Sequence, residues 1–213
     1  MAQNLSQPPG ERAPDRREPL LSTEDRRVAF GRLSEEIRGC TLCHLAQGRL
    51  HAVVYRGSLA PQVVFVGEAP GAEEDRQGIP FVGRSGRVLD AAVARLGDAL
   101  GEHGVLNVLK CRPPGNRFDP AAARTCRPYL ERQLDLLRPR ALVPLGARAL
   151  KALDSASPPI LQVAGRPRRT DLGWIFPLVH PAATLRSRRL RERWDRDLGT
   201  LGAWLADGAV ETV

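Results

Sequence analysis

The sequence predicts an α/β protein, a three-layer α/β/α sandwich with a central, mainly parallel sheet. Apolar strand-like segments alternate along the chain with segments of helical spacing, the order that βαβ units produce. The strand-like segments are continuously apolar, as QVVFV at 62–66 is, and such runs are typical of strands buried on both faces. A chain of 213 residues, 42% of them hydrophobic, has the size and core of one such domain.

The chain begins with a segment that has little to bury. Residues 1–21 are rich in Pro, Arg, Glu and Gln, so we expect a disordered tail, with the folded domain spanning 22–213. Ser22 can cap a helix that runs to about Arg38, with Asp25 as its capping-box partner. The apolar positions of this helix recur at roughly helical spacing: Val28, Leu33 and Ile37.

The expected strands define where a site should lie. In open parallel sheets, ligands bind beyond the carboxyl ends of the strands. The loops after residues 66, 110 and 179 should therefore converge on one site. The strands are expected at 62–66, 105–110 and 140–145, with shorter strands within 160–179 and a long Gly/Pro-rich loop after the first.

Helices are expected between these strands. Asp119 and Pro120 suit a helix start, since Asp caps a helix and Pro fits its first position. Pro128 should interrupt this helix, so that a second helix runs over 128–138. The other helices are expected at 86–100, 147–154 and about 187–206.

The charge of the chain favours a polyanionic partner. Its net charge is +8 and its pI about 10.3, which is typical of many nucleic-acid-binding proteins, although an arginine-rich composition also follows from a GC-rich genome. No apolar run approaches the ~20 residues of a membrane helix, and no secretory signal is visible. We therefore expect a cytoplasmic protein without membrane contact.

The four cysteines form two pairs. The spacing is C-x2-C, then 67 residues, then C-x14-C. Disulfides are rare in cytoplasmic proteins, so a metal site is the better explanation, and four thiolates can hold either zinc or a [4Fe–4S] cluster. Unrelated buried cysteines are the alternative. The cysteines are Cys40, Cys43, Cys111 and Cys126.

The loop at 67–86, GEAPGAEEDRQGIPFVGRSG, holds five glycines, two prolines and four acids. It lacks GxGxxG and GxxxxGK[ST], and its acids would repel phosphate, so a phosphate-binding loop is excluded. Glu68 at the first turn suggests a base that acts on water. Phe81 suggests an aromatic platform, although a buried Phe is more often part of a core. A flexible surface loop is the alternative for the whole segment.

Polar residues accompany the later strands. Asn107 lies inside the predicted strand VLNVLK, where an amide either satisfies backbone groups or reads a planar amide-like edge such as that of uracil. His180 follows IFPLV directly and is a candidate catalytic group, although a lone histidine is more often structural. Arg186, on the same loop, is the arginine of this region best placed to bind phosphate.

These segments together resemble the family 4 uracil-DNA glycosylases. The resemblance rests on GEAPGAEEDRQGIPFVG, NVLKCRPPGNR and HPAATLR together with the cysteines, and it covers about 36–206. It implies the fold of these glycosylases and an enzyme of DNA repair that hydrolyses the N-glycosidic bond of deoxyuridine in DNA, releasing uracil and leaving an abasic site. Uracil-containing DNA, single- or double-stranded, would be the partner, and we expect a monomer.

The resemblance also implies roles for the residues that match its motifs. Glu68 would position or activate water, and His180 would stabilise charge on the leaving base. Phe81 would stack on uracil and Asn107 would read its edge, whereas Glu74 would crowd the C5 position and exclude thymine. Two further residues of the first motif would line the base pocket: Gly67 and Ala69.

The remaining matches concern the cofactor and the duplex. Leu185 and Arg186 would belong to a loop that wedges into the duplex. The resemblance assigns a [4Fe–4S] cluster to the four cysteines: Cys40, Cys43, Cys111 and Cys126.

Two other functions fit part of the sequence. A non-catalytic nucleic-acid-binding module stabilised by metal would explain the charge and the cysteines, but not the polar residues at three strand ends. An electron-transfer protein would need neither the loop 67–86 nor a histidine after the last strand. A glycosylase accounts for all of these features.

Overall fold

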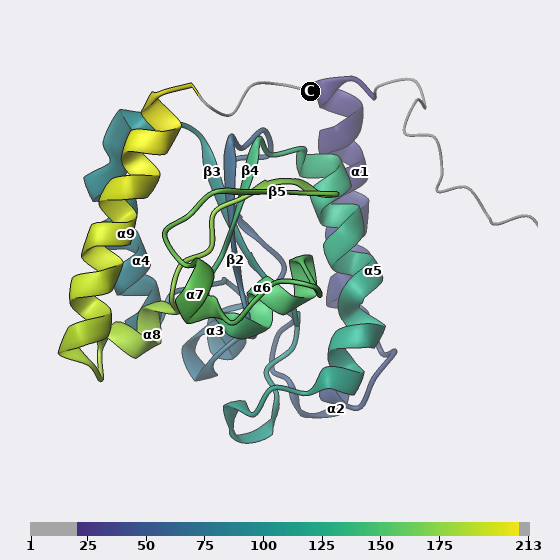
Figure 1. Ribbon diagram of the computed structural model, residues 1–213. Coiled ribbons are helices and arrows are strands. Elements are labelled where there is room, and N and C mark those ends of the chain that lie inside the picture. Colours follow the sequence, from purple (N-terminus) through teal and green to yellow (C-terminus); the bar gives the residue numbers. More distant parts are fainter. Residues whose placement is uncertain (1–20, 209–213) are drawn as a thin grey trace, which may run out of the picture.

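The computed structural model describes residues 21–208 as a sheet between two layers of helices (Figure 1). The predicted tail, 1–21, lies outside the described residues except for Leu21, which is exposed. No described helix is long and apolar enough to cross a membrane. The predicted α/β sandwich is confirmed.

The described sheet has six strands in the order β1-β3-β2-β4-β6-β5. The four central strands are parallel, whereas β1 and β5 pair antiparallel at the two edges. The sheet is therefore mainly parallel, as predicted. The strands are β1 (Arg56–Gly57), β2 (Val63–Gly67), β3 (His103–Asn107), β4 (Ala141–Pro144), β5 (Arg168–Thr170) and β6 (Gly173–Ile175).

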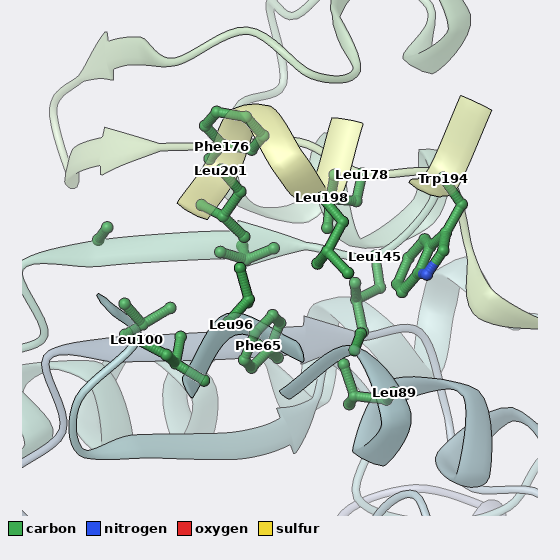
Figure 2. Packing of buried hydrophobic residues seen from close by; sticks show 14 of the residues in the cluster. Phe65, Leu89, Leu96, Leu100, Leu145, Phe176, Leu178, Trp194, Leu198 and Leu201 are labelled. Carbon is green, nitrogen blue, oxygen red and sulfur yellow. The ribbon is translucent and has the colours of Figure 1, made fainter. Parts of the chain in front are cut away.

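Alternate side chains of β2 enter different cores, which explains its continuous apolar run. Val63 and Phe65 pack with α4 and α9, while Val64 and Val66 pack with α1, α5 and α6. Figure 2 shows the first of these cores, in which Phe65 lies near Leu96. The helices of the two layers are α4 (Arg84–Leu96), α8 (Pro181–Thr184) and α9 (Arg188–Ala206), and opposite them α1 (Thr23–Arg38), α5 (Pro120–Leu137) and α6 (Ala147–Leu153).

Helix α1 has the predicted limits and cap. The Ser22 Oγ accepts a hydrogen bond from the backbone N of Asp25 at 3.1 Å and donates one to its carboxylate. The predicted apolar face is wrong at Val28, which is 48% exposed, because Phe30 faces the sheet in its place. Propensity and spacing define the helix, but the neighbouring layer decides which side is buried.

Helix α5 continues through Pro128, so the predicted break is wrong. Asp119 caps its start as predicted, accepting from the backbone N of Ala121 and Ala122. Pro128 is exposed, and the carbonyl that its missing N–H leaves free belongs to Arg124, which is also exposed and can be solvated. Burial of the residues that follow holds the helix together: Tyr129, Leu130, Leu134 and Leu137.

Several other helix and strand boundaries differ from the predicted ones at polar turns. Helix α4 begins two residues early and ends at Leu96, where a short 3-10 turn, Gly97–Ala99, follows. Strand β3 ends at Asn107 and not at residue 110. The expected loop 67–86 contains a short helix, α3. The elements without a prediction are β1, α2 (Leu45–Gly48), α3 (Ala72–Gln77), α8 and a 3-10 turn at Pro114–Asn116. Of the segment 160–179, where shorter strands are expected, β5 and β6 are strands, but Ile160–Val163 forms helix α7 and the last strand already ends at Ile175.

Candidate active site

The site is built around Gly67, at the carboxyl end of β2. Gly67 pairs in register with Asn107, the last residue of β3. A Cβ atom on Gly67 would lie 2.3 Å from Asn107 Oδ1 and 2.5 Å from Phe81 Cε2. Glycine is therefore the residue that allows Asn107 and Phe81 to approach this strand end, and two of the three predicted loops meet here.

Phe81 is held in a strained backbone conformation. Its φ is 56°, in the left-handed region that non-glycine residues rarely adopt. Gly86 permits this turn, because a Cβ there would lie 1.8 Å from the Phe81 carbonyl oxygen. The Phe81 ring is 6.1 Å from that of His180, centroid to centroid, with 31° between their planes. The loop after residue 179 thereby reaches the same site.

Asn107 has a buried amide without a partner among residues 21–208. Its side chain is 1% exposed, yet neither Oδ1 nor Nδ2 makes a hydrogen bond. Its backbone is held firmly, since the buried Lys110 Nζ donates to the Asn107 carbonyl oxygen at 2.6 Å. An unpartnered buried amide is unfavourable by about 1–3 kcal/mol, so its presence at a strand end indicates a ligand.

His180 caps helix α8. Its Nδ1 accepts a hydrogen bond from the backbone N of Ala182 at 3.1 Å. Nδ1 must therefore carry a lone pair, which places the ring proton on Nε2. Burial lowers the pKa of His180 to about 4, so the ring is neutral at pH 7. The residue is a fixed neutral donor through its Nε2–H.

Glu68 follows Gly67 and is half-buried. Burial raises the pKa of its carboxyl above the ordinary value, and the charge of Arg148 opposes this rise. Its backbone continues the pairing with the neighbouring chain segment, since the Leu109 N–H donates to the Glu68 carbonyl oxygen at 3.1 Å. The carboxyl group is thus held on a fixed backbone and has a pKa above its ordinary value.

Glu74, on α3, joins the two ends of the loop. Its Oε2 accepts from the backbone N of Gly71 at 3.0 Å, and its Oε1 accepts from that of Gly83 at 2.8 Å. The side chain is 8% exposed. Both oxygens are engaged, so the carboxylate is rigid and fixes the segment that carries Phe81.

The four cysteines line one small cavity between α1, the loop after β3, and α5. None of them forms a disulfide. Arg49 donates to Cys111 Sγ at 3.1 Å, and burial raises the pKa of Cys111 and of Cys126. Within residues 21–208, no three His, Cys, Asp or Glu side chains are close enough to hold a single metal ion. The four thiols thus line one cavity without a disulfide among them.

Leu185 and Arg186 lie at the far end of α8 from His180. Leu185 is 37% exposed and Arg186 is exposed. Ala69 is half-buried and packs beside the cluster of apolar residues around Cys111. The structure thus brings Gly67, Phe81, Asn107 and His180 together, with Leu185 and Arg186 on the adjoining surface.

Comparison with known proteins agrees with this geometry. The model of the uracil DNA glycosylase superfamily matches residues 54–198, which include the whole site apart from the first cysteine pair. This chain belongs to the uracil-DNA glycosylase superfamily.

The relatives of this glycosylase indicate its family within the superfamily. It is 36% identical to the type-4 uracil-DNA glycosylase of Sulfurisphaera tokodaii, over 78% of this chain and 80% of the relative. It is 38% identical to that of Pyrobaculum aerophilum, over 78% and 90%. It is also 38% identical to that of Thermotoga maritima, over 73% and 83%. The predicted family is confirmed, and so is the prediction of a DNA repair enzyme that removes uracil from DNA.

The sequence did not reveal several residues that support the glycosylase site. Lys110 and Asp75 are charged side chains that are nearly fully buried, and Arg49 and Arg148 face Cys111 and Glu68. One signal was present for Lys110: it is one of two lysines among 32 basic residues and directly precedes a cysteine. The partners of the other three lie far away in sequence, and no local pattern indicates them.

Proposed function

We propose that this glycosylase binds uracil flipped out of DNA through Asn107 and hydrolyses its N-glycosidic bond with His180 and Glu68. The observation that carries this proposal is the unpartnered amide of Asn107, buried beside Gly67 and Phe81. An enzyme that acts on a base in a duplex must take that base out of the stack, and a buried amide with unused donor and acceptor atoms suits the edge of an extruded base.

Recognition would use the amide and the ring. The Asn107 amide offers one donor and one acceptor side by side, which match the O4 and N3–H of uracil. Cytosine has a donor in place of O4 and would leave the amide mispaired. Phe81 would stack on the base. Gly67 would line the base site without a side chain to obstruct it. Ala69, whose side chain packs beside Cys111, would take part through its backbone.

Thymine would be excluded at Glu74. An additional methyl in a yielding pocket changes binding by only ~1–3 kcal/mol. Glu74 is bound at both carboxylate oxygens, to Gly71 and Gly83, so it cannot rotate away from a methyl group at C5. A fixed side chain supports stronger discrimination than a mobile one.

Bond cleavage would be assisted from both sides. As the bond between C1′ and N1 breaks, the sugar gains positive charge and uracil gains negative charge, and water then adds to C1′. The neutral His180 would donate its Nε2–H to the developing charge on O2, as an oxyanion-hole donor does. Glu68, as a carboxylate, would stabilise the sugar cation, orient the water and accept its proton as the C1′–O bond forms, and a raised pKa favours that proton transfer.

The four cysteines would hold a [4Fe–4S] cluster. Four thiols that line one cavity are the donor set that a [4Fe–4S] cluster takes. Four thiolates also bind zinc, and the resemblance to the family 4 glycosylases is what favours the cluster. When bound, the cluster would supply a structural cross-link between α1, the loop after β3, and α5.

Leu185 would enter the duplex where uracil leaves it, and Arg186 would bind a neighbouring phosphate. Both side chains are exposed next to the helix that starts at His180. We expect the protein to act as a cytoplasmic monomer with residues 22–213 as one glycosylase domain, which size-exclusion chromatography and limited proteolysis can test.

Single-turnover cleavage of a labelled uracil-containing oligonucleotide tests the reaction, with alkali treatment and a thymine oligonucleotide as control. We expect strand breaks only at uracil. His180→Ala should slow cleavage by about 10²–10³-fold while DNA binding changes little. Equal losses in both would exclude the role of His180, and no cleavage by protein with bound iron and sulfide would favour a binding module.

A further inference from the structure

A groove of about 350 Å³ lies between α4, α8 and α9, outside the residues assigned above apart from Leu185 at its edge. Figure 1 shows α4 and α9 side by side on the same face of the sheet. Apolar side chains form the floor and arginines form the rim. The arginines are Arg84, Arg87, Arg95 and Arg191, and the one acidic residue is Asp195.

The charges of this groove are unbalanced. Asp195 pairs with Arg95. Arg84 and Arg191 are exposed, and their side chains make no hydrogen bond or ion pair with any residue in 21–208. Two exposed guanidinium groups above an apolar floor suit a ligand with phosphates and apolar faces, which a DNA strand with its deoxyribose rings provides.

Two helices connect the groove to the proposed uracil site along the chain. Helix α4 starts three residues after Phe81, and α8, which is capped by His180, ends at the groove-lining Thr184. Arg84 and Arg95 are eleven residues apart on α4, which corresponds to about 16 Å along the helix. That length spans several phosphates of one DNA strand, because successive phosphates rise about 3.4 Å in B-DNA.

We infer that this groove binds the phosphates of the DNA strand flanking the flipped nucleotide, with Arg84 and Arg191 as its main contacts. The inference rests on the proposed uracil site, because that site fixes where the strand enters. The groove extends the DNA interface beyond the Leu185–Arg186 segment along one side of the molecule. An acidic peptide is the competing ligand for such a surface.

Salt-dependent binding tests the inference. Fluorescence anisotropy would measure the affinity for an oligonucleotide with a tetrahydrofuran abasic site, which the enzyme cannot cleave, between 50 and 200 mM NaCl. The double variant R84A/R191A should reduce the slope of log K against log salt by about 1.4–1.8, since each phosphate contact contributes about 0.7–0.9. The matched control is R27A/R32A, which removes two exposed arginines from α1 on the opposite face of the sheet.

Shortening the oligonucleotide gives a second readout. Removing the nucleotides on one side of the abasic site should weaken DNA binding by the wild-type protein. The same removal should weaken DNA binding by R84A/R191A less. An unchanged slope in R84A/R191A would overturn the inference and leave the acidic peptide as the candidate ligand. An equal decrease in R27A/R32A would also overturn it, because the effect would then follow from total charge and not from the groove. The same wild-type sample is also assayed for uracil cleavage. If it does not cleave, the proposed function itself is contradicted. If it cleaves and the salt slope of R84A/R191A is unchanged, only the role of the groove is contradicted.

Discussion

The side chain of Asn107 shows how a single residue can oppose stability. Its amide is fully desolvated and makes no hydrogen bond among the described residues, while Lys110 holds its backbone. A core selected for stability alone would place an apolar side chain there. The amide is therefore maintained at the expense of folding free energy, as binding groups in closed pockets often are.

Replacing Asn107 with Leu should separate stability from activity. Leu has a similar shape and removes two unsatisfied polar atoms, so we expect the free energy of unfolding to rise by about 1–2 kcal/mol. Single-turnover uracil cleavage should fall at least 100-fold. Urea unfolding and oligonucleotide cleavage measure the two effects, and a destabilised variant would show that Asn107 has a structural partner.

His180 makes stability depend on pH in a predictable direction. Its pKa is about 4 in the folded protein, below its ordinary value of 6.5, so the unfolded chain binds the proton more readily. The contribution of the neutral His180 to the free energy of unfolding is fully present above pH 6.5 and decreases as the pH falls toward 4. The difference between the two pKa values contributes about 3 kcal/mol at most to the free energy of unfolding. Protonation of Nδ1 would also remove the cap of α8.

Urea unfolding at pH 7, 5.5 and 4.5 tests this expectation, with His180→Gln as the comparison. The wild-type protein should lose more stability than the variant over this range. Parallel pH profiles would mean that His180 titrates normally and is more accessible than its burial indicates.

Among the elements, α3 is attached by one buried carboxylate to the segment that follows the first cysteine pair. The Leu50 N–H donates to Asp75 Oδ1 at 3.0 Å, and His51 Nδ1 lies 3.0 Å from the Asp75 carbonyl oxygen. The next residue toward the N-terminus is Glu74, which fixes Gly83 and so the Phe81 turn. The segment after the first cysteine pair and the Phe81 turn are thus joined through two adjacent acids.

Substitutions at Asp75 should show the strength of this attachment. Asp75→Leu leaves the Leu50 N–H unsatisfied, so the free energy of unfolding should decrease by about 1–3 kcal/mol. Asp75→Asn keeps the acceptor oxygen and serves as the matched control, with a smaller loss. Denaturant unfolding of the two variants provides the comparison, and equal losses would indicate that the charge, and not the hydrogen bond, is what matters.

The sequence predicted elements where local chemistry decides them. Ser22 and Asp119 cap their helices as expected, and the apolar run of β2 marked a strand buried on both faces. The errors arose where distant contacts decide. Pro128 remains helical because apolar residues beyond it are buried, and α3 forms where Glu74 reaches Gly83 nine residues away.

The site was predictable to the same extent. Glu68, Asn107 and His180 could be named as candidates because each stands near a strand end. The tautomer of His180 and the rigidity of Glu74 could not, because they depend on backbone N–H groups whose direction only the folded chain determines.

For the whole molecule, the four cysteines connect segments that are far apart in the sequence. They join the end of α1, the loop after β3, and the middle of α5 around one cavity. The central strands β2 and β4 are buried independently of this cavity, in the two large cores. Loss of one of the four cysteines should therefore destabilise these outer segments before it destabilises the central strands.

Cys43→Ser tests this by hydrogen exchange. We expect faster amide exchange at residues 39–52 and 108–118, with β2 and β4 unchanged, because the cross-link holds only the outer segments. The comparison is wild-type protein with its metal content verified by iron and sulfide analysis. Uniformly faster exchange would mean that the cysteine site supports the entire fold.

The order of these cysteines in the chain also bears on biosynthesis. Cys40 and Cys43 leave the ribosome well before Cys126, and β2, α3, α4 and β3 are translated between the two pairs. The cavity cannot close until α5 has emerged. Insertion of the proposed [4Fe–4S] cluster would therefore have to wait for a largely translated chain, and the supply of iron and sulfide would be a late step in the maturation of this enzyme.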